Sequence, residues 1–133
     1  MINVWSYLDE YKIEKKEINS AISSVLESGQ LILGPQVKKF EENFSKWHHS
    51  KFSVGVANGT DAIFLALKAF DIGVGDEVIT VSNTAVPTVS AITAAGATPV
   101  FVDINPDTYL IDIDLIASKI TKRTKAIIPV HLY

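Results

Sequence analysis

The chain has 133 residues, of which 47% are hydrophobic and 20% are charged, and it contains no cysteine. These proportions are typical of a globular domain and exclude a disordered, collagen-like or coiled-coil chain, while the lack of cysteine excludes a disulfide scaffold and a cysteine-ligated metal site. The net charge of −3 argues against a general nucleic-acid-binding protein. Without a signal-type N-terminus or an apolar run long enough to span a membrane, we expect a cytoplasmic protein.

Two helices are predicted in the first fifty residues. Residues 14–26 place branched apolar side chains on one stripe, and Ser28-Gly29 supplies a stop signal. After a short apolar turn, Pro35 fits the first turn of a second helix that continues to residue 47, because its missing N–H costs nothing there. We interpret residues 1–50 as an N-terminal helical segment.

Strand and helix patterns alternate after residue 50. Apolar runs predict strands over residues 52–57, 77–82, 98–104 and 126–132, and helices are expected over residues 62–70, 86–95 and 112–120. Continuous apolar strands that alternate with helices indicate an α/β fold with a mainly parallel sheet and helices on both faces. We assign residues 51–133 to this domain and expect it to be incomplete, because the chain stops inside an apolar strand.

The sharpest functional signal is the sequence Asn58-Gly59-Thr60-Asp61, which joins a predicted strand to a helix. Gly59 allows a ligand to approach the backbone, and the first N–H groups of a helix have no intrahelical partner. With the Thr60 hydroxyl, these groups would suit a phosphate. The alternative is an ordinary helix start in which Asn58 or Thr60 acts only as a cap.

Other polar residues are interpreted as structural. Asp76 and Glu77 follow a glycine-rich turn, which favours a solvated turn over a catalytic pair. Asp103 and His131 end predicted strands, where a loop-holding or hydrogen-bonding role is favoured over catalysis. The adjacent His48-His49 is a poor candidate for a metal pair because the two side chains diverge.

Four blocks in order resemble the N-terminal part of the DegT/StrS-type sugar aminotransferases: SGQLILGPQVKKFEENFSKW, VANGTDAIFLALKAFDIGVGDEVITVSNTAVPT, AAGATPVFVDINPDTYLID and ITKRTKAIIPVHLY. Members of this family use pyridoxal 5′-phosphate (PLP) to aminate keto-sugars that are attached to nucleotides. The resemblance implies a truncated large domain of the aspartate-aminotransferase-like fold, also called fold type I. It also implies that no catalytic residue lies in this chain, because the Schiff-base lysine is expected beyond Tyr133.

The resemblance assigns the phosphate of PLP to Gly59 and Thr60. It places the loop over residues 83–88, with Ala85 and Thr88, against the pyridine ring. Many members have an aromatic side chain where this sequence has Ala85, so stacking at that face is lost or is supplied by another group.

The N-terminal segment is also implied to approach the active site. Tyr7 and Gly34 are the candidates for contact with the sugar nucleotide, some of it across a subunit boundary. The alternative is that Tyr7, with Trp5 and Leu8, simply packs against the large domain.

The resemblance implies a homodimeric enzyme with shared active sites, which transfers an amino group from glutamate to a keto-sugar nucleotide. A dTDP-linked 3-keto-6-deoxyhexose is the favoured substrate, and deoxysugar or polysaccharide biosynthesis the implied setting. Two alternatives remain open: a PLP-dependent sugar dehydratase, in which histidine replaces the lysine, and a non-catalytic binding or regulatory relative. The 133 residues alone are expected to be inactive and poorly soluble.

Overall fold

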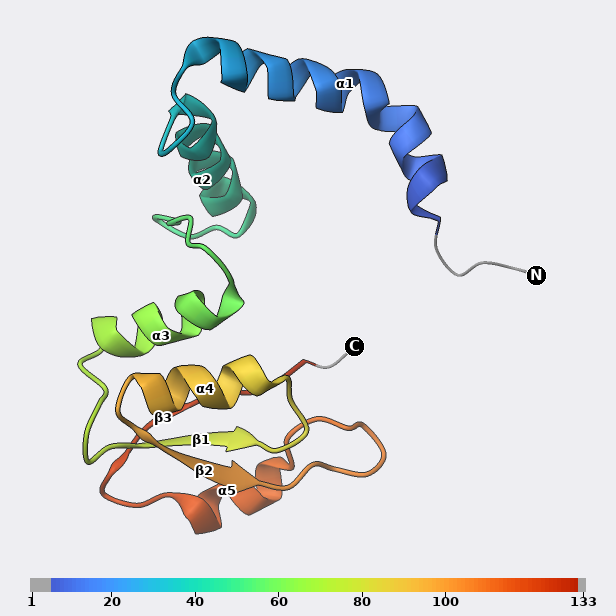
Figure 1. Cartoon of the computed structure of the whole chain (residues 1–133). Coiled ribbons are helices and arrows are strands. Elements are labelled where there is room, and N and C mark those ends of the chain that lie inside the picture. The colour runs from blue at the N-terminus through green and yellow to red at the C-terminus, as the bar shows by residue number, and fades with distance from the viewer. Residues whose placement is uncertain (1–5, 132–133) are drawn as a thin grey trace. The chain divides into compact units, whose positions relative to one another are not determined.

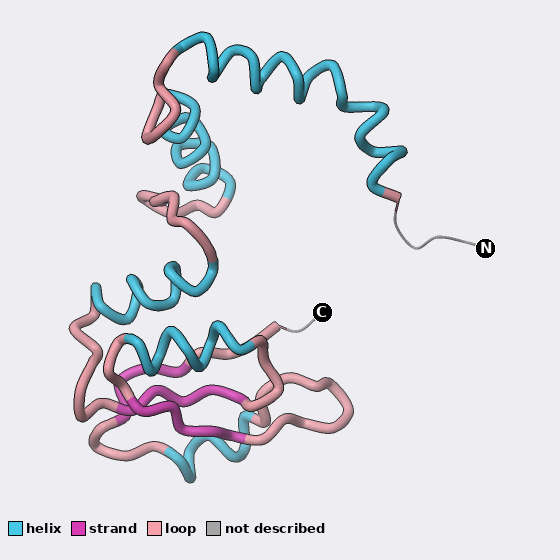
Figure 2. Tube along the Cα trace, in the orientation of Figure 1, coloured by secondary structure: helices cyan, strands magenta, loops and turns pink. Residues whose placement is uncertain are grey.

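The structure is a computed structural model that describes residues 6–131, and its two compact units divide between Gly55 and Val56 (Figures 1 and 2). The predictions for Trp5, Leu132 and Tyr133 therefore lie outside the described residues. Within the described range, no helix combines the length and the hydrophobicity that a membrane crossing requires.

The N-terminal unit contains helices α1 (Tyr7–Ser28) and α2 (Pro35–Trp47). Helix α1 begins well before the predicted residue 14, because no helix breaker interrupts residues 7–13 and the acids of its first turn favour the positive end of the helix dipole. Gly29 ends the helix in the left-handed conformation, with φ of 68°, and confirms the predicted stop. Pro35 is the first residue of α2, as predicted.

The C-terminal unit is built around a three-stranded parallel sheet in the order β2-β1-β3. Its elements are α3 (Gly59–Ala69), β1 (Glu77–Val81), α4 (Val86–Ala94), β2 (Thr98–Val102), α5 (Ile113–Lys119) and β3 (Thr124–Ile127). The chain crosses from β1 to β2 through α4 and then returns through α5 to pair β3 with the other edge of β1. Two right-handed crossovers that run in opposite directions place their helices on opposite faces, and Figure 1 shows α4 and α5 on opposite sides of the sheet. The predicted architecture is confirmed.

The core of this unit lies between β1 and the helices α3 and α4. All five residues of β1 are buried, and a cluster formed by Leu67, Ile72, Val78, Ile92, Ala95 and Ala97 fills the interface. A central strand of a parallel sheet is covered on both faces, and the burial of every residue of β1 fits this position. Residues of α3 and α4 thus pack against this strand in one core.

Two strand predictions were wrong. Residues 52–57 form no strand, since a strand needs a hydrogen-bonded neighbour and the sheet of the described residues contains only β2, β1 and β3. The last strand covers residues 124–127 rather than 126–132. Beyond it, the Ile128 N–H still donates to the Ile79 carbonyl at 2.8 Å, so the chain follows β1 for one residue more.

The sequence indicated a solvated turn at Glu77, and this prediction was wrong. The residue is buried at the first position of β1. Its carboxylate accepts hydrogen bonds from the Thr121 hydroxyl at 2.6 Å and from Arg123 Nε at 3.0 Å. The hydrogen bond from Thr121, followed by that from Arg123, lowers the pKa of Glu77 from its ordinary value of 4.5. These contacts hold the segment that precedes β3 against the amino end of β1.

We therefore predict that Glu77→Gln lowers the thermal unfolding midpoint at neutral pH. A depressed folded-state pKa contributes stability that is present above the unfolded pKa and lost as the pH falls through the folded value. The difference between wild type and Glu77→Gln should thus shrink as the pH falls below 4.5. Thermal melts of the full-length protein across this range measure the effect.

Asp9→Asn is the matched control, because Asp9 pairs with Lys12 on the exposed surface of α1. Exposed pairs contribute little to stability, so this variant should melt like wild type at neutral pH. An equal shift in both variants, or a pH-independent difference for Glu77→Gln, would contradict the assignment.

Candidate functional site

The candidate functional residues of the C-terminal unit lie at the carboxyl ends of its parallel strands. Figure 1 shows β1 and β2 pointing to the edge at which α3 and α4 have their N-terminal ends. Ligands of open parallel sheets bind beyond this edge, because loops and helix N-termini converge there. The arrangement brings Gly59 and Thr60 of α3 to the same edge as the loop that follows β1.

The start of α3 is set by Asn58. Its Oδ1 accepts a hydrogen bond from the Asp61 N–H at 2.9 Å, and its Nδ2 donates to the Asp61 carboxylate at 3.1 Å. Asn58 therefore acts as the cap, which is why α3 begins at Gly59 and not at the predicted residue 62. Thr60, the alternative cap, is left with its hydroxyl uncommitted among the described residues.

The cap leaves two N–H groups available. The Asp61 N–H is bound by Asn58, and the Ala62 N–H donates to the Asn58 carbonyl at 3.1 Å. The N–H groups of Gly59 and Thr60 have no acceptor within residues 6–131, and they lie at the positive end of the α3 dipole. Together with the Thr60 hydroxyl they form a donor set that suits an oxyanion.

Gly59 has a feature that packing does not explain. A Cβ at this position would meet no atom within 4 Å, and the backbone is not in the left-handed region that favours glycine. Neither a clash nor the backbone conformation thus requires glycine in the protein by itself. The open space beside two unpaired N–H groups fits a phosphate that lies directly against the backbone.

The loop after β1 forms the second part of the site. The Thr84 N–H donates to the Ser82 carbonyl at 2.9 Å, which turns the chain tightly as it leaves the strand. Ala85 precedes α4 with an exposed side chain and offers no capping group. Thr88, in the first turn of α4, is buried, and its hydroxyl lies 2.7 Å from that of Thr84.

Tyr7 and Gly34 belong to the other unit. The ring of Tyr7 stacks on that of Tyr11 with centroids 5.9 Å apart. Gly34 precedes α2, and a Cβ there would lie 2.6 Å from the Gln30 carbonyl oxygen, so this glycine is required by local packing. Each residue therefore has a structural role within its own unit.

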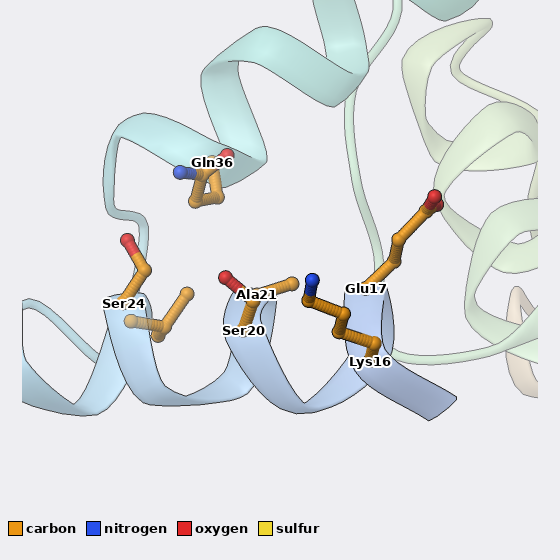
Figure 3. A pocket seen from close by; sticks show the side chains of 7 residues that line it. Lys16, Glu17, Ser20, Ala21, Ser24 and Gln36 are labelled. Carbon is orange, nitrogen blue, oxygen red and sulfur yellow. The ribbon is translucent and has the colours of Figure 1, made fainter. Parts of the chain in front are cut away.

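The N-terminal unit also has a hollow between α1 and α2 (Figure 3). Its lining consists of Lys16, Glu17, Ser20, Ala21, Ser24, Val25 and Gln36. The lining residues of α1 lie in the middle of the helix, where backbone N–H groups are already bonded. The α1 part of this lining therefore offers no free N–H donors like those at the start of α3.

The remaining polar candidates have local roles. The carboxylate of Asp103 accepts from the Ile104 N–H at 2.8 Å, and that of Asp76 accepts from the Gly73 N–H at 3.0 Å. The ring of His48 lies 4.3 Å from that of Phe44. Asp103 thus holds its loop, which is the role that the sequence favoured.

Sequence reasoning missed two side-chain contacts. The Glu77–Arg123 pair joins residues far apart in the chain, and no local signal predicts it. Thr84 and Thr88 are four residues apart, a spacing that places side chains on one helical face. That spacing was the available signal. Thr84 lies before the first residue of α4, however, so the direction of its side chain is set by the loop.

Comparison with known proteins identifies the chain's family. The model of the DegT/DnrJ/EryC1/StrS aminotransferase family matches residues 12–133. The chain belongs to this family. The resemblance carried by the four sequence blocks is thereby confirmed over nearly the whole chain.

Curated relatives within the family include several sugar transaminases. A dTDP-3-amino-3,4,6-trideoxy-alpha-D-glucose transaminase from Micromonospora megalomicea subsp. nigra is 53% identical over 98% of this chain and 35% of its own length. A dTDP-3-amino-3,6-dideoxy-alpha-D-galactopyranose transaminase from Aneurinibacillus thermoaerophilus is 53% identical over 90% of this chain and 33% of its own. A pleiotropic regulatory protein from Geobacillus stearothermophilus is 46% identical over 94% and 34%. The chain spans about a third of the length of these relatives.

Solved structures agree with the family assignment. DesV from S. venezuelae superposes with a TM-score of 0.92 and 41% identity, over 96% of this chain and 34% of its own. The ntda protein from Bacillus subtilis, solved with bound cofactor PMP, gives a TM-score of 0.87 and 41% identity, over 90% and 28%. The fold is therefore that of PLP-dependent aminotransferases, and PLP is the family's cofactor, as the resemblance implied.

We predict that Gly59→Val weakens PLP binding by the full-length protein about tenfold or more, the order expected when hydrogen bonds to a charged group are lost. A Cβ at this position meets no protein atom within 4 Å, so the branched side chain extends into the space beside the free N–H groups. Thermal stability without PLP should thus stay close to that of wild type. Equilibrium titration with PLP and melts of the PLP-free protein separate the two effects.

Gly59→Ala provides the graded control, since its single methyl group intrudes less and should weaken binding less than valine does. Wild-type affinity in Gly59→Val would show that the phosphate lies elsewhere. A large loss of stability without PLP would show that Gly59 serves the fold instead.

Proposed function

We propose that the protein to which this chain belongs transfers an amino group from glutamate to a nucleotide-linked keto-sugar, using PLP. The observation that carries the proposal is the start of α3, where two free N–H groups and the Thr60 hydroxyl surround open space at Gly59. The family is one of aminotransferases, which supports the reaction class. An enzyme of this class must hold PLP during amino transfer, and a phosphate anchor serves that purpose.

Gly59 and Thr60 are proposed to bind the PLP phosphate. Their N–H groups donate to phosphate oxygens at the positive end of α3, and the Thr60 hydroxyl adds a third donor. Asn58 keeps α3 capped, so the donors stay oriented before any ligand arrives. When bound, PLP supplies the carbonyl group and the electron-accepting ring on which amino transfer depends.

Ala85 and Thr88 are proposed to complete the cofactor site from the loop after β1. Ala85 lies at the turn into α4 with its methyl group exposed, so it presents a small apolar contact and no capping group. The catalytic lysine is not assigned to any residue of this chain. Lys119 ends α5, Lys122 lies in the approach to β3 and Lys125 is near the start of β3, all away from the carboxyl edge.

For the substrate we propose a dTDP-linked 3-keto-6-deoxyhexose, which would place the protein in deoxysugar or polysaccharide biosynthesis. Support comes from the two dTDP-sugar transaminases that are 53% identical to this chain. Tyr7 and Gly34 are proposed to lie near the sugar nucleotide, in a cytoplasmic homodimer with shared active sites. We further propose residues 1–50 and 51–133 as the N-terminal segment and the first part of the PLP-binding domain.

A regulatory role is the second candidate function. It is favoured by the similarity to the pleiotropic regulatory protein of Geobacillus stearothermophilus, which is 46% identical over 94% of this chain. A PLP-dependent dehydratase is the remaining alternative, and the residue that would distinguish it is expected beyond Tyr133. Enzyme and regulator differ in one respect: only the enzyme exchanges amino groups with glutamate.

Amino transfer is tested on the full-length protein in two half-reactions. Glutamate added to the PLP-loaded protein should remove its visible absorption band and release 2-oxoglutarate, and a dTDP-linked 3-keto-6-deoxyhexose should restore the band. A spectrum that glutamate leaves unchanged would contradict the aminotransferase. Restoration by 2-oxoglutarate but not by keto-sugar would retain amino transfer and reject the substrate.

We predict that Ala85→Phe tightens PLP binding by about 2- to 10-fold, the equivalent of the 0.5–1.5 kcal/mol of an aromatic contact. Ala85 is exposed at the entrance to α4, so a larger side chain meets no buried neighbour. Ala85→Leu is the control, because it adds apolar volume without an aromatic face. Equal gains for Phe and Leu would indicate simple apolar contact, and a large loss with Phe would show that another group already covers the ring.

A further inference from the structure

The loop over residues 82–85 connects the buried strand β1 to helix α4. Its backbone is held by the Thr84 N–H, which donates to the Ser82 carbonyl at 2.9 Å. Within residues 6–131, the hydroxyl pair of Thr84 and Thr88 is the only side-chain hydrogen bond made by these four loop residues. The Thr88 N–H also donates to the Ala85 carbonyl at 3.1 Å, so the Thr84–Thr88 pair is the side-chain link that adds to this backbone bond between the loop and α4.

Helix α4 has no capping side chain, which is the usual means of fixing a loop to the start of a helix. The cap position of α4 is occupied by Ala85, whose side chain accepts no hydrogen bond, and Pro87 in the first turn has no N–H. Serine, threonine, asparagine or aspartate at the cap would bind the N–H groups of the first turn. The Thr84–Thr88 bond takes over the tethering that a capping side chain would provide.

Thr88 is a rigid partner for this tether. It is buried, with 7% of its surface exposed. It lies on α4, the helix whose residues Ala91 and Ile92 are fully buried in the core. A buried hydroxyl left without a partner is costly, and no other hydrogen bond of the Thr88 side chain is seen among the described residues. Its hydroxyl is thus committed to Thr84 rather than directed at a ligand.

We propose that Thr84 is a positioning residue for the cofactor: its hydroxyl bond to Thr88 holds the 82–85 loop in the place from which Ala85 contacts the ring of PLP. This inference rests on the proposed function, and it redefines Thr88, which acts through Thr84 instead of touching the cofactor. The phosphate anchor at Gly59 and Thr60 is on a different helix, so loosening the loop leaves phosphate binding unchanged.

The test uses the full-length protein and two probes, PLP and inorganic phosphate. Thr84→Val keeps the shape of the side chain and removes the hydroxyl, and should weaken PLP binding by about fivefold, the order set by one neutral hydrogen bond. Inorganic phosphate, measured by its competition with PLP, should bind as it does to wild type. Thr84→Ser keeps the hydroxyl and should restore PLP affinity.

The matched control is Thr93→Val. Thr93 is an exposed threonine of the same helix, and its hydroxyl donates to the Val89 carbonyl at 3.0 Å, away from the loop. It should bind both probes as wild type does. Thr88→Val removes the other hydroxyl of the pair and should give the same loss of PLP affinity as Thr84→Val. The double variant should lose no more than either single variant. Thr88→Val also provides the test if Thr84→Val does not fold.

Three outcomes would overturn the inference. They are wild-type PLP affinity in Thr84→Val, equal weakening in Thr84→Ser and Thr84→Val, and a parallel loss of inorganic phosphate binding, which would mean a general structural effect. Failure of the proposed function shows itself separately, because PLP-loaded wild-type protein would then leave its spectrum unchanged with glutamate, whatever the PLP affinities of the Thr84 variants.

Discussion

Strand β1 supports the C-terminal unit because it is paired along both edges and covered on both faces. β2 and β3 occupy its edges, and its residues Val78, Ile79 and Thr80 have no exposed surface. Such a strand has one orientation and one register, because any slip would expose apolar side chains or leave backbone groups unpaired. The position of its carboxyl end then decides where the following loop and helix lie.

The proposed cofactor site follows from that constraint and from helix ends. α4 begins after a four-residue loop from β1, and α3 packs against α4 with its N-terminal end at the same edge (Figure 1). Helix starts leave N–H groups without partners, and Asn58 binds only one of those available on α3. The fold therefore brings unpaired donors to the sheet edge, and Gly59 leaves the space beside them open. This part of the site needs no catalytic side chain, only the backbone N–H groups and the Thr60 hydroxyl.

Local chemistry made much of this predictable from the sequence. The Ser28-Gly29 stop, Pro35 at the start of α2 and the apolar run of β1 each act over a few residues, and the structure has them as expected. The sequence also indicated that a helix follows Asn58-Gly59, although it placed the first helical residue at 62 and not at Gly59.

The failures involve residues whose structure depends on partners far away in the sequence. Residues 52–57 have the composition of a strand but pair with no strand among the described residues. Glu77 resembles a turn residue until Thr121 and Arg123 are placed beside it. Thr84 was overlooked because its role depends on the direction of a hydroxyl group, which sequence patterns do not specify.

The location of the cofactor phosphate tests this account most directly. In a crystal structure of the full-length protein with PLP, the phosphate oxygens should lie about 3 Å from the N atoms of Gly59 and Thr60, the normal distance for N–H···O hydrogen bonds. The pyridine ring should lie against Ala85. A phosphate bound at another helix end, with Gly59 and Thr60 facing only solvent, would contradict the account.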